Sequence, residues 1–267
     1  MSWFDRDPAG SSGPGTSNVI AILQARVSSS RLPGKVLKPI LGRPMLLHQL
    51  DRVRRARTLD ALIVATSTDP SDDPIDAMCR SEGVSCFRGS LNDVLDRFYQ
   101  AALPHRPRAI TRLTGDCPLI DPALIDRVVD FFHAEGVDLA ATAETYPDGL
   151  DVEVVRFDTL AHAWQHATAP PDREHVTLFV RRQPERFRVG LYPSKIDLSH
   201  LRLTVDEPQD FELVKRIYEA LYPRSAAFTT DDILELLKAR PDLLNLNRGI
   251  RRNEGLARSL AADPPEA

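Results

Sequence analysis

Three cationic side chains follow directly on the first apolar run of the chain, "VIAIL" at 19–23. The next stretch, "QARVSSSRLPGKVLKP" at 24–39, places Arg26, Arg31 and Lys35 beside three serines and a glycine. Small residues allow backbone N–H groups to converge on an anion, and arginine and lysine neutralise phosphate charge. The stretch therefore predicts a triphosphate-binding loop, with a solvated basic surface loop as the alternative. It matches neither G-x-G-x-x-G nor G-x-x-x-x-G-K-[ST], which disfavours NAD enzymes and P-loop kinases.

Two aspartates each follow an apolar segment, far apart in the sequence. Asp116 lies in "RLTGDCPLIDP" and Asp206 lies in "LRLTVDEPQDFELV". Mg²⁺ binds through one or two protein carboxylates together with substrate phosphates, so these two side chains are candidates to share one Mg²⁺. The alternative for Asp116 is a Gly-Asp turn, whereas Pro208 is expected at the start of a helix and leaves Asp206 outside it. A cationic loop that faces two carboxylates suits nucleotidyl transfer.

Alternating strands and helices are expected to position these groups. Apolar runs predict strands at 18–24, 61–67, 84–87 and 109–115, and helical spacing predicts helices at 45–57, 74–83, 92–103 and 122–135. This alternation is typical of βαβ units in an α/β fold with a mostly parallel sheet, where ligands bind beyond the carboxyl ends of the strands. A less regular second half predicts strands at 138–142, 150–155, 187–192 and 201–205, and helices at 159–166, 173–182, 208–221 and 229–240.

Composition divides the chain of 267 residues into three parts. Residues 1–17 are rich in Gly, Ser and Pro and predict a disordered N-terminal segment. Residues 18–247 carry the alternating pattern and predict one domain, and residues 248–267 predict a loose C-terminal tail.

The overall charge and hydropathy exclude several classes of protein. A formal charge of −4 disfavours general nucleic-acid binding, so the basic cluster at the N-terminus points to a small anion. No apolar stretch reaches the length of a membrane span, and the N-terminus lacks the order of a signal peptide. The three cysteines, Cys79, Cys86 and Cys117, have no C-x-x-C spacing and fit a reducing compartment. We expect a cytoplasmic protein with no membrane partner.

Seven segments taken in order resemble a known family. They are "ILQARVSSSRLPGKVLKPILGRPML", "IVATSTDPSDDPI", "FRGSLNDVLDRFYQAA", "TRLTGDCPLIDPALID", "TYPDGLDVEVV", "DREHVT" and "LRLTVDEPQDFELV". Together they resemble the SpsF-type cytidylyltransferases of spore coat polysaccharide biosynthesis, which are related to the CMP-3-deoxy-manno-octulosonate and CMP-acylneuraminate synthetases. The resemblance covers roughly residues 18–222.

The resemblance implies both a fold and an activity. The fold would be a Rossmann-like nucleotidyltransferase fold, a mostly parallel twisted sheet flanked by helices with a small irregular region for dimerisation. The activity would be the Mg²⁺-dependent transfer of CMP from CTP to a sugar-acid-like acceptor with release of pyrophosphate, for a surface polysaccharide or another glycan. A homodimer is also expected, with its interface at about 150–195.

The resemblance also implies roles for particular residues. Arg26, Arg31 and Lys35 match the triphosphate-binding positions of the family, Asp116 matches its metal-binding aspartate, and Asp206 resembles the second metal ligand. We expect Arg26, Arg31, Lys35 and Asp116 to be catalytic. The predicted nucleotide site comprises Gln24, Ala25, Arg26, Ser28, Ser29, Ser30, Arg31, Lys35, Thr66, Arg88, Ser90, Thr114 and Asp116.

The remaining site residues are expected to surround the base, the ribose and the acceptor. Thr66, Arg88 and Ser90 follow the second and third strands, where they could meet the base and ribose, although a surface ion pair would equally explain Arg88. Pocket-lining loops carry function, so "YPDGLDVEV" and "DREHVT" are interpreted as acceptor-binding segments. The predicted acceptor site comprises Arg112, Asp148, Asp151, Glu153, Arg173 and His175.

Two other functions remain open from the sequence. A nucleotide-sugar-dependent glycosyltransferase would share the fold, but the chain has "DVE" at 151–153 and no suitably placed D-x-D motif. A non-catalytic nucleotide-binding subunit is disfavoured because Lys35, Asp116 and Asp206 are all present.

A zinc site at His162 and His166 is disfavoured because "HAWQH" lacks the glutamate of H-E-x-x-H and a third ligand. Cys117 has no assignable basic partner, which disfavours a nucleophilic role.

Overall fold

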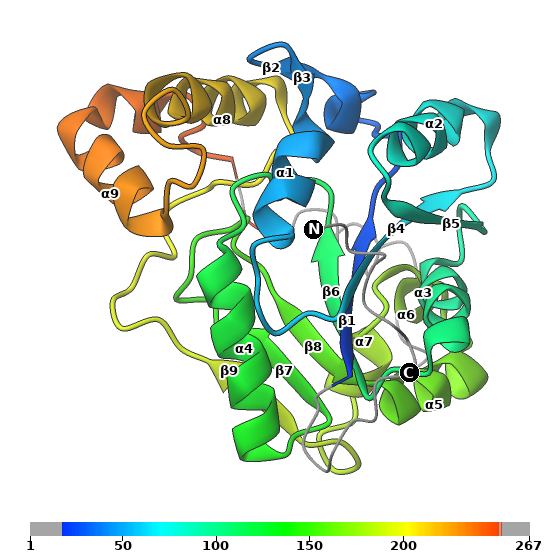
Figure 1. The fold of residues 1–267 in the computed structure, drawn as a ribbon. Coiled ribbons are helices and arrows are strands. Elements are labelled where there is room, and N and C mark those ends of the chain that lie inside the picture. The colour runs from blue at the N-terminus through cyan, green and yellow to red at the C-terminus, as the bar shows by residue number, and fades with distance from the viewer. Residues whose placement is uncertain (1–17, 251, 253–267) are drawn as a thin grey trace.

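The computed structural model describes residues 18–250 and Arg252, and its centre is a seven-stranded sheet in the order β5-β4-β1-β6-β8-β7-β9 (Figure 1). Four strand pairs are parallel, and only β6–β8 and β7–β8 are antiparallel, which confirms the prediction of a mostly parallel sheet. The strands are β1 (Val19–Gln24), β4 (Ala61–Ser67), β5 (Ser85–Gly89), β6 (Ala109–Thr114), β7 (Leu139–Thr142), β8 (Glu153–Arg156) and β9 (Val189–Tyr192).

Alternate residues of the central strand β1 enter two different hydrophobic clusters. Val19, Ala21 and Leu23 pack into the cluster on one face of the sheet, and Ile20 and Ile22 pack into the cluster on the other. This period of two explains why the strand reads as a continuous apolar run, because a parallel strand is covered on both faces.

Helices cover both faces of the sheet, as Figure 1 shows. The first cluster is completed by α1 (Met45–Val53), α2 (Asp73–Ser81), α4 (Pro122–Glu135), α8 (Pro208–Leu221) and α9 (Thr230–Ala239). The second is completed by α3 (Val94–Ala102), α5 (Phe157–His166) and α7 (Leu178–Arg181), with α6 (Pro170–Glu174) beside them. A small hairpin of β2 (Pro39–Ile40) and β3 (Arg43–Pro44) follows the basic loop.

The helices α4 and α8 coincide with the predicted ranges because their starts are strongly encoded. Asp121 accepts a hydrogen bond from the backbone N–H of Ala123 at the start of α4, and Pro122 occupies its first turn. Glu207 and Asp210 form a capping box at the start of α8. Among the described residues, no helix is long and apolar enough to cross a bilayer.

The predicted strand at 201–205 is wrong. This segment hydrogen-bonds to the backbone carbonyls of Asp116 and Asp148, and its only β-pairing with the described residues is an isolated bridge between Arg202 and Asp148. It passes close to Gly149, whose φ is +102° and where an added Cβ would lie 2.3 Å from the backbone nitrogen of Thr204. The alternating apolar pattern thus indicates an extended segment with one buried face, but it does not indicate whether a neighbouring strand is available for pairing.

The predicted helix at 173–182 is interrupted. It forms the short helices α6 and α7, and Val176 between them has a φ of +50°. The predicted N-terminal segment 1–17 lies outside the described residues, as does most of the predicted tail at 248–267. The division of the chain into a domain and two tails therefore stays a prediction.

The strand order reverses between β1 and β6. From β1 the chain moves outward to β4 and β5, and it then returns to place β6 on the opposite side of β1. The carboxyl ends of the two central strands meet closely, since the backbone N–H of Gly115 donates to the carbonyl oxygen of Gln24 at 2.8 Å. Open α/β sheets bind their ligands in the crevice at this position.

Candidate active site

A cavity of about 800 Å³ opens at the carboxyl ends of β1 and β6. It receives residues from the basic loop, from β6 and β8, and from the segments around α6 and α7. The predicted residues that line it are Gln24, Ala25, Arg26, Ser29, Ser30, Arg31, Lys35, Arg112, Thr114, Asp116, Asp148, Asp151, Glu153, His175 and Asp206.

The basic loop after β1 is closed on itself and tied to the neighbouring strand end. The backbone N–H of Gly34 donates to the carbonyl oxygen of Val27 at 2.9 Å, and the φ of +71° at Gly34 turns the chain back. The buried carboxylate of Asp72 accepts hydrogen bonds from the backbone N–H groups of Val27 and Ser67. The loop therefore presents its cationic side chains from a fixed backbone.

Lys35 occupies the centre of the site. Its Nζ lies 2.9 Å from Oδ1 of Asp206 and 3.3 Å from Oδ2 of Asp116, and it donates to the carbonyl oxygen of Val205 at 2.7 Å. Burial alone would lower the pKa of Lys35, but the two carboxylates raise it above its ordinary value. Burial likewise opposes ionisation of Asp116, but Lys35 and nearby hydrogen bonds hold its pKa at about 2. Both partners are therefore charged at neutral pH.

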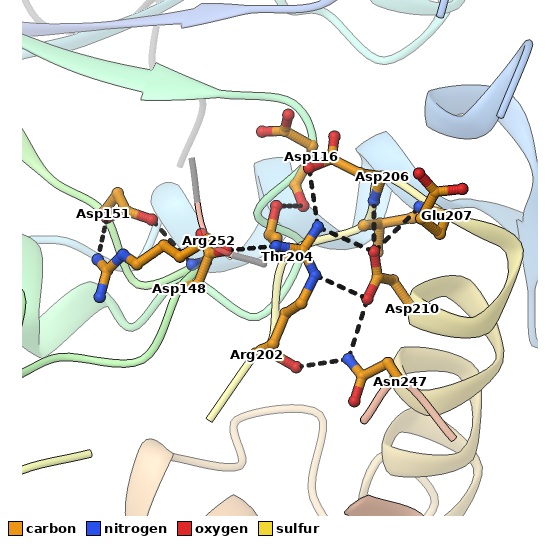
Figure 2. Close-up of polar contacts among 12 residues, drawn as sticks. Asp116, Asp148, Asp151, Arg202, Thr204, Asp206, Glu207, Asp210, Asn247 and Arg252 are labelled. Atoms are coloured by element: carbon orange, nitrogen blue, oxygen red, sulfur yellow. Dashed lines mark hydrogen bonds and ion pairs between the residues drawn. The ribbon is translucent and has the colours of Figure 1, made fainter. Parts of the chain in front are cut away.

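Arg202 holds the second carboxylate oxygen of Asp206, whose first oxygen pairs with Lys35 (Figure 2 shows the contact of Arg202). Its Nη2 lies 3.0 Å from Oδ2 of Asp206, its Nε lies 3.0 Å from Oδ1 of Asp210, and its Nη1 pairs with Asp148. Asp210 also accepts hydrogen bonds from the backbone N–H groups of Asp206 and Glu207. Arg202 is not among the residues predicted from the sequence, where its only signal is a charged residue within the alternating apolar pattern of 201–205.

Asp116 and Asp206 fit the role of ligands for a divalent cation. Both carboxylates already converge on one cationic group, the ammonium of Lys35. Within residues 18–250 and Arg252, no group of three or more His, Cys, Asp or Glu side chains forms a complete metal site. An ion held by this pair would need further oxygen ligands from substrate and water, as is usual for Mg²⁺.

A second charged cluster in the cavity wall surrounds Glu153. Its Oε2 lies 2.7 Å from Nη1 of Arg112, and its Oε1 accepts hydrogen bonds from Thr177 and Arg181. Burial opposes ionisation of Glu153, but Arg181 and Arg112 hold its pKa at about 2. Two guanidinium groups around one carboxylate give these three side chains a net charge of +1.

Two predicted arginines point away from the cavity. Arg88 lies 2.7 Å from Asp73 and donates to the carbonyl oxygen of Ser67, so the surface ion pair weighed in the sequence is the arrangement found. Arg173 pairs with Asp93 through two nitrogens and donates to a backbone carbonyl, which joins α6 to the start of α3. In both cases the guanidinium pairs with a carboxylate on a neighbouring element and does not line the cavity.

Three smaller predicted residues also lie outside the cavity wall. Thr66 is fully buried in β4, beneath the strand end. The hydroxyl of Ser90 accepts a hydrogen bond from the backbone N–H of Asp93, and Ser28 is exposed on the basic loop. The prediction that they meet the nucleotide therefore has no support from their positions.

Three arginines that the sequence reasoning did not select line the cavity: Arg97, Arg181 and Arg252. Arg252 donates to the backbone carbonyl of Tyr146 and lies 3.0 Å from Asp151, so this part of the chain reaches the site (Figure 2). Arg97 and Arg181 sit in short helices, where helical spacing reveals the buried face but not that a cavity borders it.

The two disfavoured sites gain no support. His162 and His166 stack with ring centroids 3.9 Å apart, and Nδ1 of His166 lies 2.8 Å from the carbonyl oxygen of His162. Burial and the neighbouring Asp116 raise the pKa of Cys117 well above its ordinary value, so its thiol stays protonated.

Comparison with known proteins gives consistent matches across most of the chain. A family model described as "Cytidylyltransferase" matches residues 20–238. An uncharacterised protein of Methanocaldococcus jannaschii, MJ1063, is 37% identical over 238 residues, which cover 88% of this chain and 96% of that protein. The spore coat polysaccharide biosynthesis protein SpsF of Bacillus subtilis is 34% identical over 233 residues, which cover 85% and 96%.

Two further matches are informative. A 3-deoxy-manno-octulosonate cytidylyltransferase of Anaeromyxobacter dehalogenans is 36% identical over 135 residues, which cover 49% of this chain and 54% of that protein. The structure of a cytidylyltransferase from Leptospira borgpetersenii superposes with a TM-score of 0.82 at 32% identity and covers 88% of this chain and 99% of that one. The shared architecture confirms the predicted Rossmann-like nucleotidyltransferase fold.

Proposed function

Since the chain belongs to the cytidylyltransferase family and is an enzyme of that family, we propose that it transfers CMP from CTP to a sugar-acid-like acceptor with release of pyrophosphate. Membership confirms the resemblance read from the sequence. The names of two relatives, a spore coat polysaccharide biosynthesis protein and a 3-deoxy-manno-octulosonate cytidylyltransferase, support a role in the biosynthesis of a surface polysaccharide or another glycan.

One observation carries the proposal: a cationic loop and two carboxylates from distant segments meet in a single cavity at the switch point of the sheet. Arg26, Arg31 and Lys35 line the same wall, where they can bind the β- and γ-phosphates of a nucleotide. Lys35 remains protonated because its carboxylate partners raise its pKa. A fixed positive charge at this position stabilises the charge that develops on departing pyrophosphate.

The reaction needs no covalent enzyme intermediate. An acceptor oxygen attacks the α-phosphorus of CTP, a new O–P bond forms, and the bond between the α-phosphorus and the bridging oxygen breaks to release pyrophosphate. Asp116 and Asp206 would hold Mg²⁺, which when bound would polarise the α-phosphate. The role of the chain is to fix both reactants in line, which is the main contribution to a transfer of this kind.

The cluster around Glu153 is proposed as the acceptor site. Its excess positive charge, from Arg112 and Arg181, suits an acceptor that carries a carboxylate. His175 borders the same region, and burial lowers its pKa, so it is neutral at pH 7 and can donate or accept one hydrogen bond. Asp148 and Asp151 would contact acceptor hydroxyl groups.

We also propose that the enzyme is a cytoplasmic homodimer. The edge strand β9 leaves Leu191 54% exposed, and Ile196 just after it is 60% exposed, next to the region where an interface is expected. Light scattering should give the mass of two chains. The mass of a single chain at micromolar concentration would overturn the homodimer.

A panel assay tests the proposed function. Pyrophosphate release would be measured with each of the four ribonucleoside triphosphates and Mg²⁺, against ulosonic acids, neutral sugars and phosphonates. We expect release with CTP and an acceptor that bears a carboxylate. Turnover of a neutral sugar alone, or of a triphosphate other than CTP, would contradict the proposed substrates.

A further inference from the structure

Arg97 is a buried charge with few partners. It lies in α3 with 1% of its surface exposed, and the only hydrogen bond of its side chain to the described residues runs from Nη1 to the carbonyl oxygen of Ser90 at 3.0 Å. Its Nε is buried without a partner, and it forms no ion pair with any of residues 18–250 or Arg252. A guanidinium group has five N–H donors, so most of its hydrogen-bonding capacity is unused.

A second arginine buried to the same degree behaves differently. Arg52 is also 1% exposed, but its Nε and Nη1 donate to the carbonyl oxygens of Ile120 and Phe228, and its guanidinium lies 4.5 Å from the centre of the Phe228 ring. Arg52 joins elements of the fold and lies outside the cavity. Arg97 lines the cavity, and its side chain links α3 only to the carbonyl oxygen of Ser90. A role in stabilising the fold therefore does not account for its burial.

The carboxylates nearest to Arg97 are engaged elsewhere. Asp72 accepts hydrogen bonds from the backbone of Val27 and Ser67, and Asp93 is paired with Arg173. Burial, together with the charge of Arg26, lowers the pKa of Arg97 to about 10, which Asp72 and Asp93 only partly offset. Keeping this guanidinium buried therefore costs free energy that a ligand could repay.

The position of Arg97 indicates which part of a nucleotide it meets. The helix α3 packs against β5, β4 and β1, whereas Glu153 lies on β8, which β6 separates from β1 in the sheet. Val94 of α3 and Gln24 at the end of β1 line the cavity with Arg97, and the charge of Arg26 on the loop after β1 acts on its guanidinium, whereas Asp116 follows β6. A nucleotide with its phosphates at Lys35 and its α-phosphate toward the acceptor places its base on the side of α3.

Cytosine offers a guanidinium two adjacent acceptors, carbonyl O2 and ring N3. Uracil carries a hydrogen on N3, which would face an N–H donor. We therefore propose that Arg97 selects cytosine over uracil by donating to O2 and N3 of the base. The assignment rests on the proposed use of CTP. Bidentate arginine contacts to a base edge discriminate between bases by about 10- to 100-fold.

Equilibrium binding tests the assignment without any acceptor. Dissociation constants for CTP and UTP, each with Mg²⁺, would be measured by calorimetry for the wild-type protein and for Arg97→Met. We expect the wild type to prefer CTP, and Arg97→Met to bind CTP about 10- to 100-fold more weakly while its affinity for UTP changes little. Arg97→Lys keeps the charge but not the two-pronged geometry and should lose most of the preference as well.

Arg52→Met is the matched control, because it removes an equally buried arginine outside the cavity. It should lower the midpoint of thermal unfolding and leave the ratio of the two dissociation constants unchanged. Arg97→Met should unfold at or above the wild-type midpoint in the absence of nucleotide, since it removes an unpaired buried charge.

The outcomes separate this assignment from the proposed function. A wild-type protein that binds no CTP would overturn both. A wild-type preference for CTP that survives unchanged in Arg97→Met and Arg97→Lys would overturn the assignment alone. So would an Arg97→Met protein that is destabilised like Arg52→Met and retains the preference.

Discussion

Nζ of Lys35 lies 2.9 Å from Oδ1 of Asp206, although 171 positions separate the two residues in the sequence. The same ammonium group lies 3.3 Å from Asp116, which follows β6. The contact joins the basic loop after β1 to the segment that leads into α8. The ammonium group thus brings together two carboxylates from distant segments, and the site exists only in the folded chain.

Replacing Lys35 should disturb both the charges and the reaction. In Lys35→Met the pKa of Asp116 should rise from about 2, because burial would no longer be opposed by the ammonium group. Pyrophosphate release should fall by about 100-fold or more, since one fixed charge at the departing phosphates is lost. NMR titration of the carboxyl carbon and a pyrophosphate assay measure the two effects.

Lys38→Met is the control for Lys35→Met. Lys38 lies three positions along, 5.6 Å from the centre of the Phe211 ring, and does not line the cavity. Its loss should leave turnover within about twofold, because a half-buried cation–π contact of this kind contributes about 1 kcal/mol to stability alone. Equal losses in both variants would argue against a specific role for Lys35.

Glu153 should make the stability of the protein depend on pH in acid. Its pKa of about 2 in the folded chain lies below the ordinary value of 4.5, so the ionised carboxylate stabilises the fold above about pH 4.5. That contribution is lost as the pH falls toward 2. In Glu153→Gln the free energy of unfolding at pH 7 should fall by on the order of 3 kcal/mol, and the difference from wild type should shrink toward pH 2.

Urea unfolding at a series of pH values measures this effect. Glu212→Gln serves as the control, since Glu212 forms an exposed ion pair with Arg216 one helical turn away. Such pairs contribute about 0.5 kcal/mol or less. A difference between Glu153→Gln and wild type that does not change with pH would contradict the assigned pairing with Arg112 and Arg181.

Gly149 should be intolerant of a side chain. A Cβ there would lie 2.3 Å from the backbone nitrogen of Thr204, and its φ of +102° disfavours any other residue. Gly149→Ala should displace the 201–205 segment, and with it Asp206, so both stability and turnover should fall. The loss of stability should exceed about 2 kcal/mol.

The matched control is Gly136→Ala at the end of α4. Gly136 also has a positive φ, +59°, but an added Cβ meets nothing within 4 Å. It should cost about 1 kcal/mol and leave turnover per folded molecule unchanged. If Gly149→Ala were as mild as Gly136→Ala by thermal unfolding, the close approach to Thr204 would be refuted.

Arg181 should affect the acceptor rather than the nucleotide. Arg181→Met leaves Arg112 as the only guanidinium bound to Glu153 and removes the excess positive charge. The KM for the acceptor should rise by about 10-fold or more, while the dissociation constant of CTP stays unchanged. Arg182→Met is the control, because Arg182 pairs with Asp172 and does not line the cavity. A raised KM for CTP in Arg181→Met would contradict the proposed acceptor site.

Helix-start residues in the sequence correctly predicted the helices α4 and α8. Asp121 with Pro122, and Glu207 with Pro208, specify helix starts within a few residues, and the ranges of α4 and α8 were correct for that reason. The segment at 201–205 shows the limit, because extended backbone becomes a strand only if a neighbour presents a free edge.

The site residues show the same division. Lys35, Asp116 and Asp206 could be grouped from the sequence because each follows a predicted strand or apolar run at one edge of the sheet. Arg88 obeyed the same rule, yet Asp73 on α2 draws it away from the cavity. Arg97 was not predicted as a site residue. Its position in an amphipathic helix indicates that it is buried, but not that its guanidinium lines the cavity.

The proposed reaction depends most directly on the carboxylate of Asp116. Asp116→Asn keeps the size of the side chain but removes the charge that pairs with Lys35 and would bind Mg²⁺. The exposed ion-pair residue Asp242 supplies the control Asp242→Asn. The decisive measurement is Mg²⁺-dependent pyrophosphate release from CTP at saturating acceptor. We expect a loss of at least about 100-fold in Asp116→Asn with a wild-type circular dichroism spectrum, and no loss in Asp242→Asn. Turnover near the wild-type rate in a folded Asp116→Asn protein would contradict it.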